Sequence, residues 1–144
     1  MASRRKARIL AFQALFSWEA SQASVAELVD FPWLEEDKRT SIDEGTAAFA
    51  QFLIAGTIEN IEQIDTLIKK HLKNWNFDRL NRVDLAIMRM SVYSLLFQKE
   101  IPPSIVIDEA IDIAKEFGTD DSYRFINGVL DAVKKEIQGS SLSK

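Results

Sequence analysis

The sequence predicts an all-α fold of about six or seven helices, and three observations lead to that prediction. Apolar residues recur at intervals of three and four along almost the whole chain, which is the spacing of one helix face. Only three prolines and five glycines interrupt this pattern in 144 residues. Hydrophobic residues make up 47% of the chain, enough to bury a core in one domain or in two small helical bundles.

The first predicted helix covers about residues 3–20 and carries two stripes on opposite sides. Arg5, Ile9, Phe12 and Phe16 form one stripe, which is either an exposed binding surface or a second buried face of a central helix. The sequence leaves both explanations open. The other stripe is an ordinary core face and consists of Ala7, Leu10, Ala11, Ala14, Leu15 and Trp18.

Two capping boxes predict the next helix starts. Ser24 with Glu27 precedes a short helix, which the Phe-Pro-Trp segment then ends. Ser41 with Glu44 opens a longer segment. Its helical period continues to about residue 72, so we expect one long helix with a kink near Gly56.

Two further helices follow, separated by an Ile-Pro-Pro segment. The first covers about residues 82–98. Pro103 suits the first turn of the second helix, because its missing N–H has no intrahelical partner there. That helix runs to Phe117, and Gly118 is a natural C-cap.

The last predicted helix starts with Asp121 or Ser122 as its N-cap. Asn-Gly usually marks a turn, but the helical period passes through this pair, so we expect Gly128 to be a close-packing site within the helix. Residues 139–144 are rich in serine and we expect them to form a disordered tail.

Four cations stand in the first turns of the first helix: Arg4, Arg5, Lys6 and Arg8. The helix dipole disfavours positive charge there by roughly a few tenths of a kcal/mol per residue, so we expect a partner outside the helix. Residues 1–18 contain four of the 18 basic residues and none of the 22 acidic ones, although the formal net charge is −4. A basic arm on an acidic body is typical of local nucleic-acid contact, although terminal cations are also often simply solvated.

Catalytic and metal-binding patterns are missing from the sequence. There is no cysteine and only one histidine, His71, which we interpret as an exposed or capping residue. No glycine-rich phosphate loop, nucleophile elbow or zinc-protease motif is found. We therefore expect neither an enzyme nor a cofactor or metal. We interpret one set of carboxylates as a solvated helix face: Asp108, Glu109, Asp112 and Glu116.

Targeting signals are also missing from the sequence. Charged or polar residues interrupt every apolar run well before the roughly 18 residues that a membrane span requires. The N-terminal segment has cations but no uninterrupted apolar region like that of a signal peptide. We expect a cytoplasmic protein without a membrane segment.

Three motifs resemble the NusB transcription antitermination family. They are the basic start RRKARILAFQAL, the Ile-Pro-Pro before IVIDEA, and FGTDDSYRFINGVLD. The resemblance covers nearly the whole chain, with residues 21–60 the least distinctive. Asp108 stands where the family usually has asparagine, a change that leaves the helix pattern intact.

This resemblance implies a non-catalytic, all-helical RNA-binding domain over residues 1–138. Its two bundles would cover about residues 1–72 and 73–138. Family members pair with NusE, a ribosomal protein that doubles as a transcription factor, and the pair binds the single-stranded boxA element of nascent RNA. With NusA and NusG the pair helps RNA polymerase to resist termination, notably on ribosomal RNA operons.

The resemblance also assigns site residues. Cations at a helix end can contact phosphates, Phe125 could stack on a base if it is not part of the core, and Asn127 can read a base edge. Asp84 and Asp121 occupy positions favoured at helix starts whatever they bind. The expected RNA surface comprises Arg4, Arg5, Lys6, Arg8, Arg124, Phe125 and Asn127, and the expected NusE surface comprises Phe12, Phe16, Asp84 and Asp121.

Two other functions compete with this hypothesis. In a purely protein-binding helical module the basic arm would be incidental. A NusB-like domain of a ribosomal RNA cytosine methyltransferase is disfavoured, since the sequence has no cofactor-binding α/β domain and no cysteine nucleophile. The sequence leaves open the RNA sequence preference, the affinities, the source organism, and whether the free protein is a monomer or a homodimer that buries the aromatic stripe.

Overall fold

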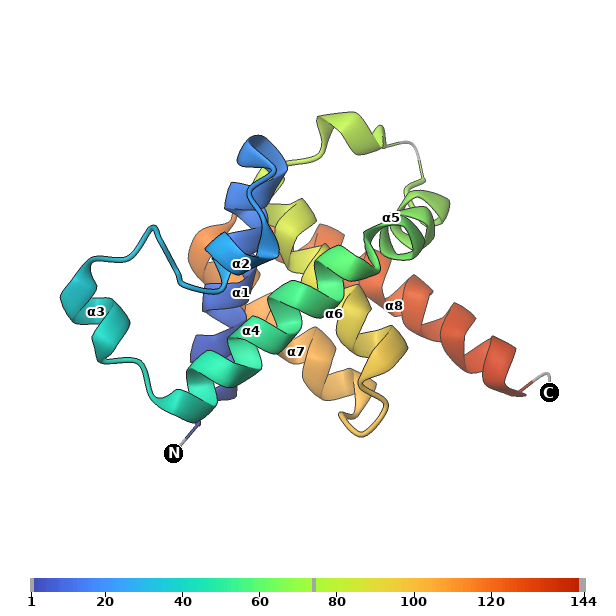
Figure 1. Cartoon of the computed structure of the whole chain (residues 1–144). Coiled ribbons are helices and arrows are strands. Elements are labelled where there is room, and N and C mark those ends of the chain that lie inside the picture. Colours follow the sequence, from blue (N-terminus) through green and yellow to red (C-terminus); the bar gives the residue numbers. More distant parts are fainter. Residues whose placement is uncertain (1, 74, 143–144) are drawn as a thin grey trace.

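A computed structural model describes residues 2–73 and 75–142, and these form an all-α fold (Figure 1). The prediction of the fold class is confirmed, with more helices than expected. The described residues form eight α-helices and one short 3-10 helix, in this order: α1 (Arg4–Ser21), α2 (Val25–Leu28), α3 (Glu36–Thr40), α4 (Glu44–Glu59), α5 (Ile61–Lys70), η1 (Phe77–Arg79), α6 (Arg82–Phe97), α7 (Pro103–Phe117) and α8 (Ser122–Leu142).

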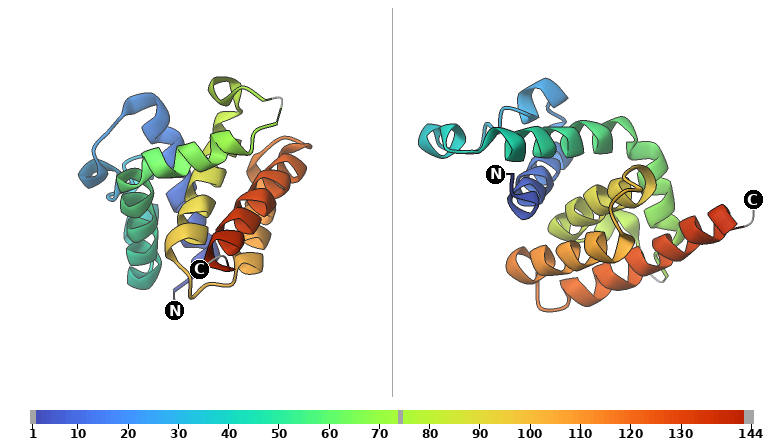
Figure 2. Two further views of the ribbon diagram at one scale, coloured as in Figure 1. Left: turned by 90° about the vertical axis from the view of Figure 1, so that its right-hand side faces the viewer. Right: turned by 90° about the horizontal axis from the view of Figure 1, so that it is seen from below.

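Helix α6 lies at the centre of the molecule and contacts α1, α4, α5, α7 and α8. Seen from below, α4 forms one layer, α1 and α6 the next, and the antiparallel pair α7 and α8 the third (Figure 2). Almost every residue of α6 from Asp84 to Leu95 is buried. Because α6 contacts helices on both sides of residue 72, one core runs through the fold, and the division into two bundles stays a prediction.

The first helices begin largely as their capping residues predict. Ser3 caps α1, and Ser24 forms the expected box with Glu27, whose backbone N–H donates to the Ser24 hydroxyl at 3.2 Å. The second predicted capping box, Ser41 with Glu44, is wrong. Helix α4 begins after Asp43, whose carboxylate accepts a hydrogen bond from the backbone N–H of Thr46 at 3.2 Å. The unexpected α3 occupies the preceding segment.

The long segment after residue 43 consists of two helices, because the chain breaks at Asn60. The expected kink at Gly56 is therefore placed wrongly by four residues. Gly56 is buried within α4, and an added Cβ would clash with the ring of Tyr93 on α6. Its small size permits the close contact of α4 with α6.

Helices α6 and α7 agree with the prediction, including Pro103 at the start of α7 and Gly118 at its C-cap. Gly128 is helical as expected but exposed, with no heavy atom within 4 Å of an added Cβ, so the close-packing interpretation is wrong. Helix α8 extends to Leu142, so residues 139–142 are helical where we expected a disordered tail. Ser143 and Lys144 lie outside the described residues.

Candidate nucleic-acid and partner interface

The cations at the start of α1 have different surroundings. Arg5 forms ion pairs with Glu116 at 3.1 Å and Asp112 at 3.5 Å, both on α7 and both exposed. Arg4 is exposed, with its guanidinium 5.9 Å from the ring centroid of Phe49. The exposed side chain of Lys6 makes no ion pair with any described residue. Since exposed ion pairs contribute only about 0–1 kcal/mol, these three cations remain available to a phosphate.

Arg8 does not belong to this exposed set. It is only 1% exposed, forms an ion pair with Glu109 of α7, and donates from Nη1 to the Ser94 hydroxyl at 3.3 Å. Burial lowers the pKa of Arg8, and the charge of Glu109 opposes that shift. Packing against α7 covers Arg8, so this burial argues against the expected contact of Arg8 with RNA, which stays a prediction. Three of the four α7 carboxylates, Glu109, Asp112 and Glu116, form ion pairs with the start of α1 and are not merely a solvated face.

The start of α8 presents basic and aromatic side chains together. Arg124 and Asn127 are exposed, and Phe125 is half-buried against Trp75, with ring centroids 5.2 Å apart. Phe125 is therefore a surface aromatic with one covered face. The sequence analysis missed two further members of this surface, Lys115 and Tyr123. The Lys115 ammonium and the Arg124 guanidinium lie 5.0 and 5.1 Å from the ring centroid of Tyr123.

A separate apolar groove of about 550 Å³ opens between α1, the Trp33 segment, and the ends of α6 and α7. Phe16 is 44% exposed on its wall, together with Phe117. Phe12 is only 3% exposed and packs under Phe117 with centroids 5.1 Å apart. The second stripe of α1 is thus partly buried and partly exposed. Phe12 lines the groove although it is almost fully covered, so its expected contact with NusE stays a prediction.

The two acidic candidates differ in exposure. Asp121 is open to solvent, with only a 3.7 Å ion pair to Arg124. Asp84 is 6% exposed in the first turn of α6, and its Oδ1 has no hydrogen-bond partner among the described residues. Burial raises the pKa of Asp84, and a hydrogen bond from Ser122 offsets part of that rise. Packing therefore covers most of the Asp84 carboxyl, and its expected contact with NusE stays a prediction.

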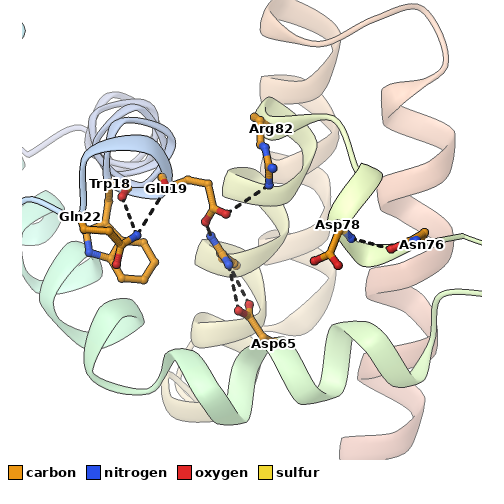
Figure 3. A network of polar contacts seen from close by, with 8 residues as sticks. Trp18, Glu19, Gln22, Asp65, Asn76, Asp78 and Arg82 are labelled. Atoms are coloured by element: carbon orange, nitrogen blue, oxygen red, sulfur yellow. Dashed lines mark hydrogen bonds and ion pairs between the residues drawn. The ribbon is translucent and has the colours of Figure 1, made fainter.

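An ion network joins α1, α5 and α6 (Figure 3). Arg89 of α6 is buried and pairs with Asp65 of α5 and Glu19 of α1. Glu19 also accepts from Arg82 at 3.2 Å, which holds the start of α6 beside α1. The sequence analysis did not identify Arg89. Its spacing could have indicated burial, since it lies four residues after Leu85 and three before Val92, on a core face.

His71 is the C-cap residue of α5 and contacts α8. The His71 ring lies 2.9 Å from Glu136, and Lys70 and His71 together lower the pKa of that carboxyl, with Lys70 the larger influence. Within residues 2–73 and 75–142, no cluster of three or more His, Cys, Asp or Glu side chains could hold a metal ion. Nor does any helix in this part of the chain have the length and apolar character to cross a membrane.

Comparison with known proteins gives one consistent match. The model of the NusB family matches residues 5–135. The transcription antitermination protein NusB of Treponema denticola is 53% identical over 133 residues, which cover 92% of this chain and 96% of that protein.

Solved structures agree in fold. NusB from T. maritima superposes with a TM-score of 0.82 and 38% identity, covering 94% of each chain. A crystal structure of antitermination factors NusB and NusE in complex with double-stranded RNA gives a TM-score of 0.81 at 32% identity, covering 92% of this chain and 96% of that one.

Proposed function

The chain belongs to the NusB family, and from this premise we propose that it is an RNA-binding transcription antitermination factor. It binds a boxA-type element of nascent RNA together with NusE, and with NusA and NusG it helps RNA polymerase to resist termination, notably on ribosomal RNA operons. It acts in the cytoplasm and without catalysis. The observation that carries this proposal is the match to a NusB structure in complex with NusE and RNA over most of the chain.

The proposed RNA surface consists of exposed cations and aromatics from two helix starts. Arg4, Arg5 and Lys6 provide phosphate contacts at the start of α1. Arg124 and Lys115 extend the positive surface toward α8. Phe125 offers one open ring face for stacking, and the exposed Asn127 amide offers a donor and an acceptor for a base edge. Arg8 is left out because it is buried.

The proposed NusE surface is the apolar groove around Phe16. Large exposed aromatic side chains are unusual on a protein that has no partner, and they are enriched at binding hot spots. Phe16, Phe117 and Trp33 line the groove above Phe12. Asp121 lies outside this groove, in the neighbouring hollow at the start of α8, and stays a candidate for a polar contact with NusE because its side chain is exposed. A second copy of the chain on this groove would compete with NusE.

Fluorescence anisotropy of a labelled boxA-type RNA tests the proposal. The protein alone should bind weakly, because few phosphates are neutralised, and NusE should tighten binding by adding surface. Phe16→Ala should abolish the tightening but leave RNA binding by the protein alone unchanged. If no RNA binds even with NusE present, the basic arm is incidental, and a protein-binding module becomes the better account.

A further inference from the structure

A second hollow, separate from the Phe16 groove, lies beside the proposed RNA surface. It has a volume of about 650 Å³ and is formed by the segment before α6, the start of α6 and the start of α8. Its lining includes Trp75, Arg79, Asp84, Arg124 and Phe125. A second carboxyl, that of the exposed Asp121, also lines the hollow and pairs with Arg124, which leaves Arg79 as the arginine without an ion pair to any described residue. The combination of two aromatic rings, an unpaired arginine and one buried carboxyl indicates a ligand with a flat ring, an anionic part and N–H donors.

The aromatic rings leave a face open. Trp75 is 62% exposed, and its ring meets that of Phe125 at an interplanar angle of 56°. The two rings are therefore tilted and do not stack closely on one another. Apart from Phe125, Trp75 has no aromatic neighbour within contact among the described residues. An exposed indole held at the mouth of a hollow provides a platform on which another flat ring can stack.

Among the described residues, two polar groups of the hollow lack a partner of opposite character: Arg79 lacks an anion, and one oxygen of Asp84 lacks a hydrogen-bond donor. The exposed Arg79 makes no ion pair within the described part of the chain, although carboxylates are frequent on this acidic protein. Asp84 lines the hollow and is nine-tenths buried; Ser122 donates to its carboxyl, but Oδ1 lacks a hydrogen-bond donor. A buried acceptor without a partner is unfavourable, so a ligand that brings an N–H donor to this carboxyl gains more than it would at an exposed one.

We propose that Trp75, Phe125 and Arg79 form a slot for one unstacked nucleobase of the bound RNA. The base stacks on Trp75, its phosphate pairs with Arg79, and an N–H on its edge donates to Asp84. This inference rests on the proposed RNA-binding function and deepens it, since it adds Trp75 and Arg79 to the RNA surface and gives Asp84 a role toward RNA. It also explains how a surface of phosphate contacts could favour particular bases.

The slot lies beside the Phe16 groove, the proposed NusE surface. Val83 lines the Phe16 groove and Asp84 lines the slot, so consecutive residues in the first turn of α6 face the two hollows. A partner seated against Val83 would therefore lie beside the bound base. One rigid helix start then presents both ligands to each other.

The test compares Trp75→Ala with Trp75→Phe and with Phe52→Ala, an exposed aromatic on α4 away from the slot. Each RNA nucleotide is replaced in turn by an abasic one, and affinity is measured by anisotropy with NusE present. For wild type, one abasic position should weaken binding by about 5- to 150-fold, equivalent to about 1–3 kcal/mol for a stacked base. Trp75→Ala should weaken the binding of intact RNA by a similar factor, and the abasic nucleotide at that position should then cause no further loss of affinity. Trp75→Phe should retain most of the affinity, and Phe52→Ala all of it.

Two outcomes would overturn the slot. One is wild-type affinity in Trp75→Ala. The other is a loss of binding free energy in Trp75→Ala that adds fully to the loss caused by every abasic position. Full additivity would mean that Trp75 shares no contact with any of these bases. Both require that wild type binds the RNA, so they differ from failure of the proposed function, in which wild type does not bind at all. Circular dichroism of the variants separates a local effect from unfolding.

Discussion

Arg89 of α6 holds Asp65 of α5 in a two-pronged ion pair, in which Nε and Nη2 each donate to one carboxylate oxygen at 2.9 Å. The guanidinium also pairs with Glu19 of α1 and lies 5.6 Å from the centroid of Trp18 (Figure 3). Burial alone would lower the pKa of Arg89, but the hydrogen bonds and the negative charges of Asp65 and Glu19 together outweigh burial and raise it. One side chain thus joins three helices.

Arg89→Met should destabilise the protein by about 3–5 kcal/mol, because it removes the buried counter-charge of Asp65 and one of the two counter-charges of Glu19. Urea denaturation followed by circular dichroism measures the change. Arg82→Ala is the control, since it removes a half-exposed pair to the same Glu19 and should cost at most about 1 kcal/mol. Equal effects of the two substitutions would contradict the central role of Arg89.

Gly56 and Gly128 offer a matched pair of helical glycines. Gly56→Ala should destabilise by about 1–3 kcal/mol, because the new methyl group collides with Tyr93. Gly128→Ala should stabilise by up to about 1 kcal/mol, because alanine is the better helix former and the site is open. Thermal unfolding of both variants measures the opposite signs. A stabilising Gly56→Ala would show that α4 can move away from α6 at little cost.

Asp84→Asn should make the protein more stable at neutral pH. Burial raises the folded-state pKa of Asp84, so the folded protein binds this proton more tightly than the unfolded chain does. Wild-type stability therefore falls as pH rises from the ordinary aspartate value of about 3.9 through the raised folded value. The variant lacks this fall.

The advantage of Asp84→Asn should accordingly vanish below about pH 4, where Asp84 is protonated in both states. Denaturant midpoints measured from pH 3 to 7 test this dependence. Asp121→Asn is the matched control, since the Asp121 side chain is exposed to solvent. An Asp84 effect that is independent of pH would show that charge burial is not its cause.

Local signals explain why much of the fold was predictable. Ser3, Ser24 and Pro103 act within one helical turn, so the starts of α1, α2 and α7 could be found without knowing the tertiary structure. The break at Asn60 carries no proline and lies between two helix-compatible segments. The helix α3 consists of charged and polar residues without an apolar face, so periodicity could not reveal it.

The exposed part of the candidate site was predictable, and the buried part was not. Helical spacing put Phe16 on the stripe opposite the core face of α1, and this ring is exposed, but the same spacing did not distinguish it from the buried Phe12. The charges of Arg8 and Asp84 favoured a surface position, but both side chains are buried. For Arg8 the helical spacing pointed the other way, since it precedes Ala11 and Leu15 at core spacing. Only the packing of α7 against α1 brings Glu109 to Arg8. Such pairing between distant segments has no local signal.

The RNA surface makes a prediction about salt. Arg4→Gln combined with Lys6→Gln should weaken RNA binding and reduce the salt slope by roughly 0.7 for each phosphate that is no longer neutralised. The charge-matched control is Lys134→Gln with Lys135→Gln, on the other end of α8, where both side chains already pair with Asp131. Anisotropy titrations at several salt concentrations give both slopes. Identical slopes for the two double variants would remove the start of α1 from the RNA surface.

Transcription in vitro tests the central claim most directly. The template carries a boxA-type leader ahead of a terminator, and the reaction contains RNA polymerase, NusA, NusG and NusE. Adding this protein should raise the fraction of full-length transcript, and a template without the boxA-type element should not respond. Read-through that is the same with and without the protein on the boxA-type template would contradict the account.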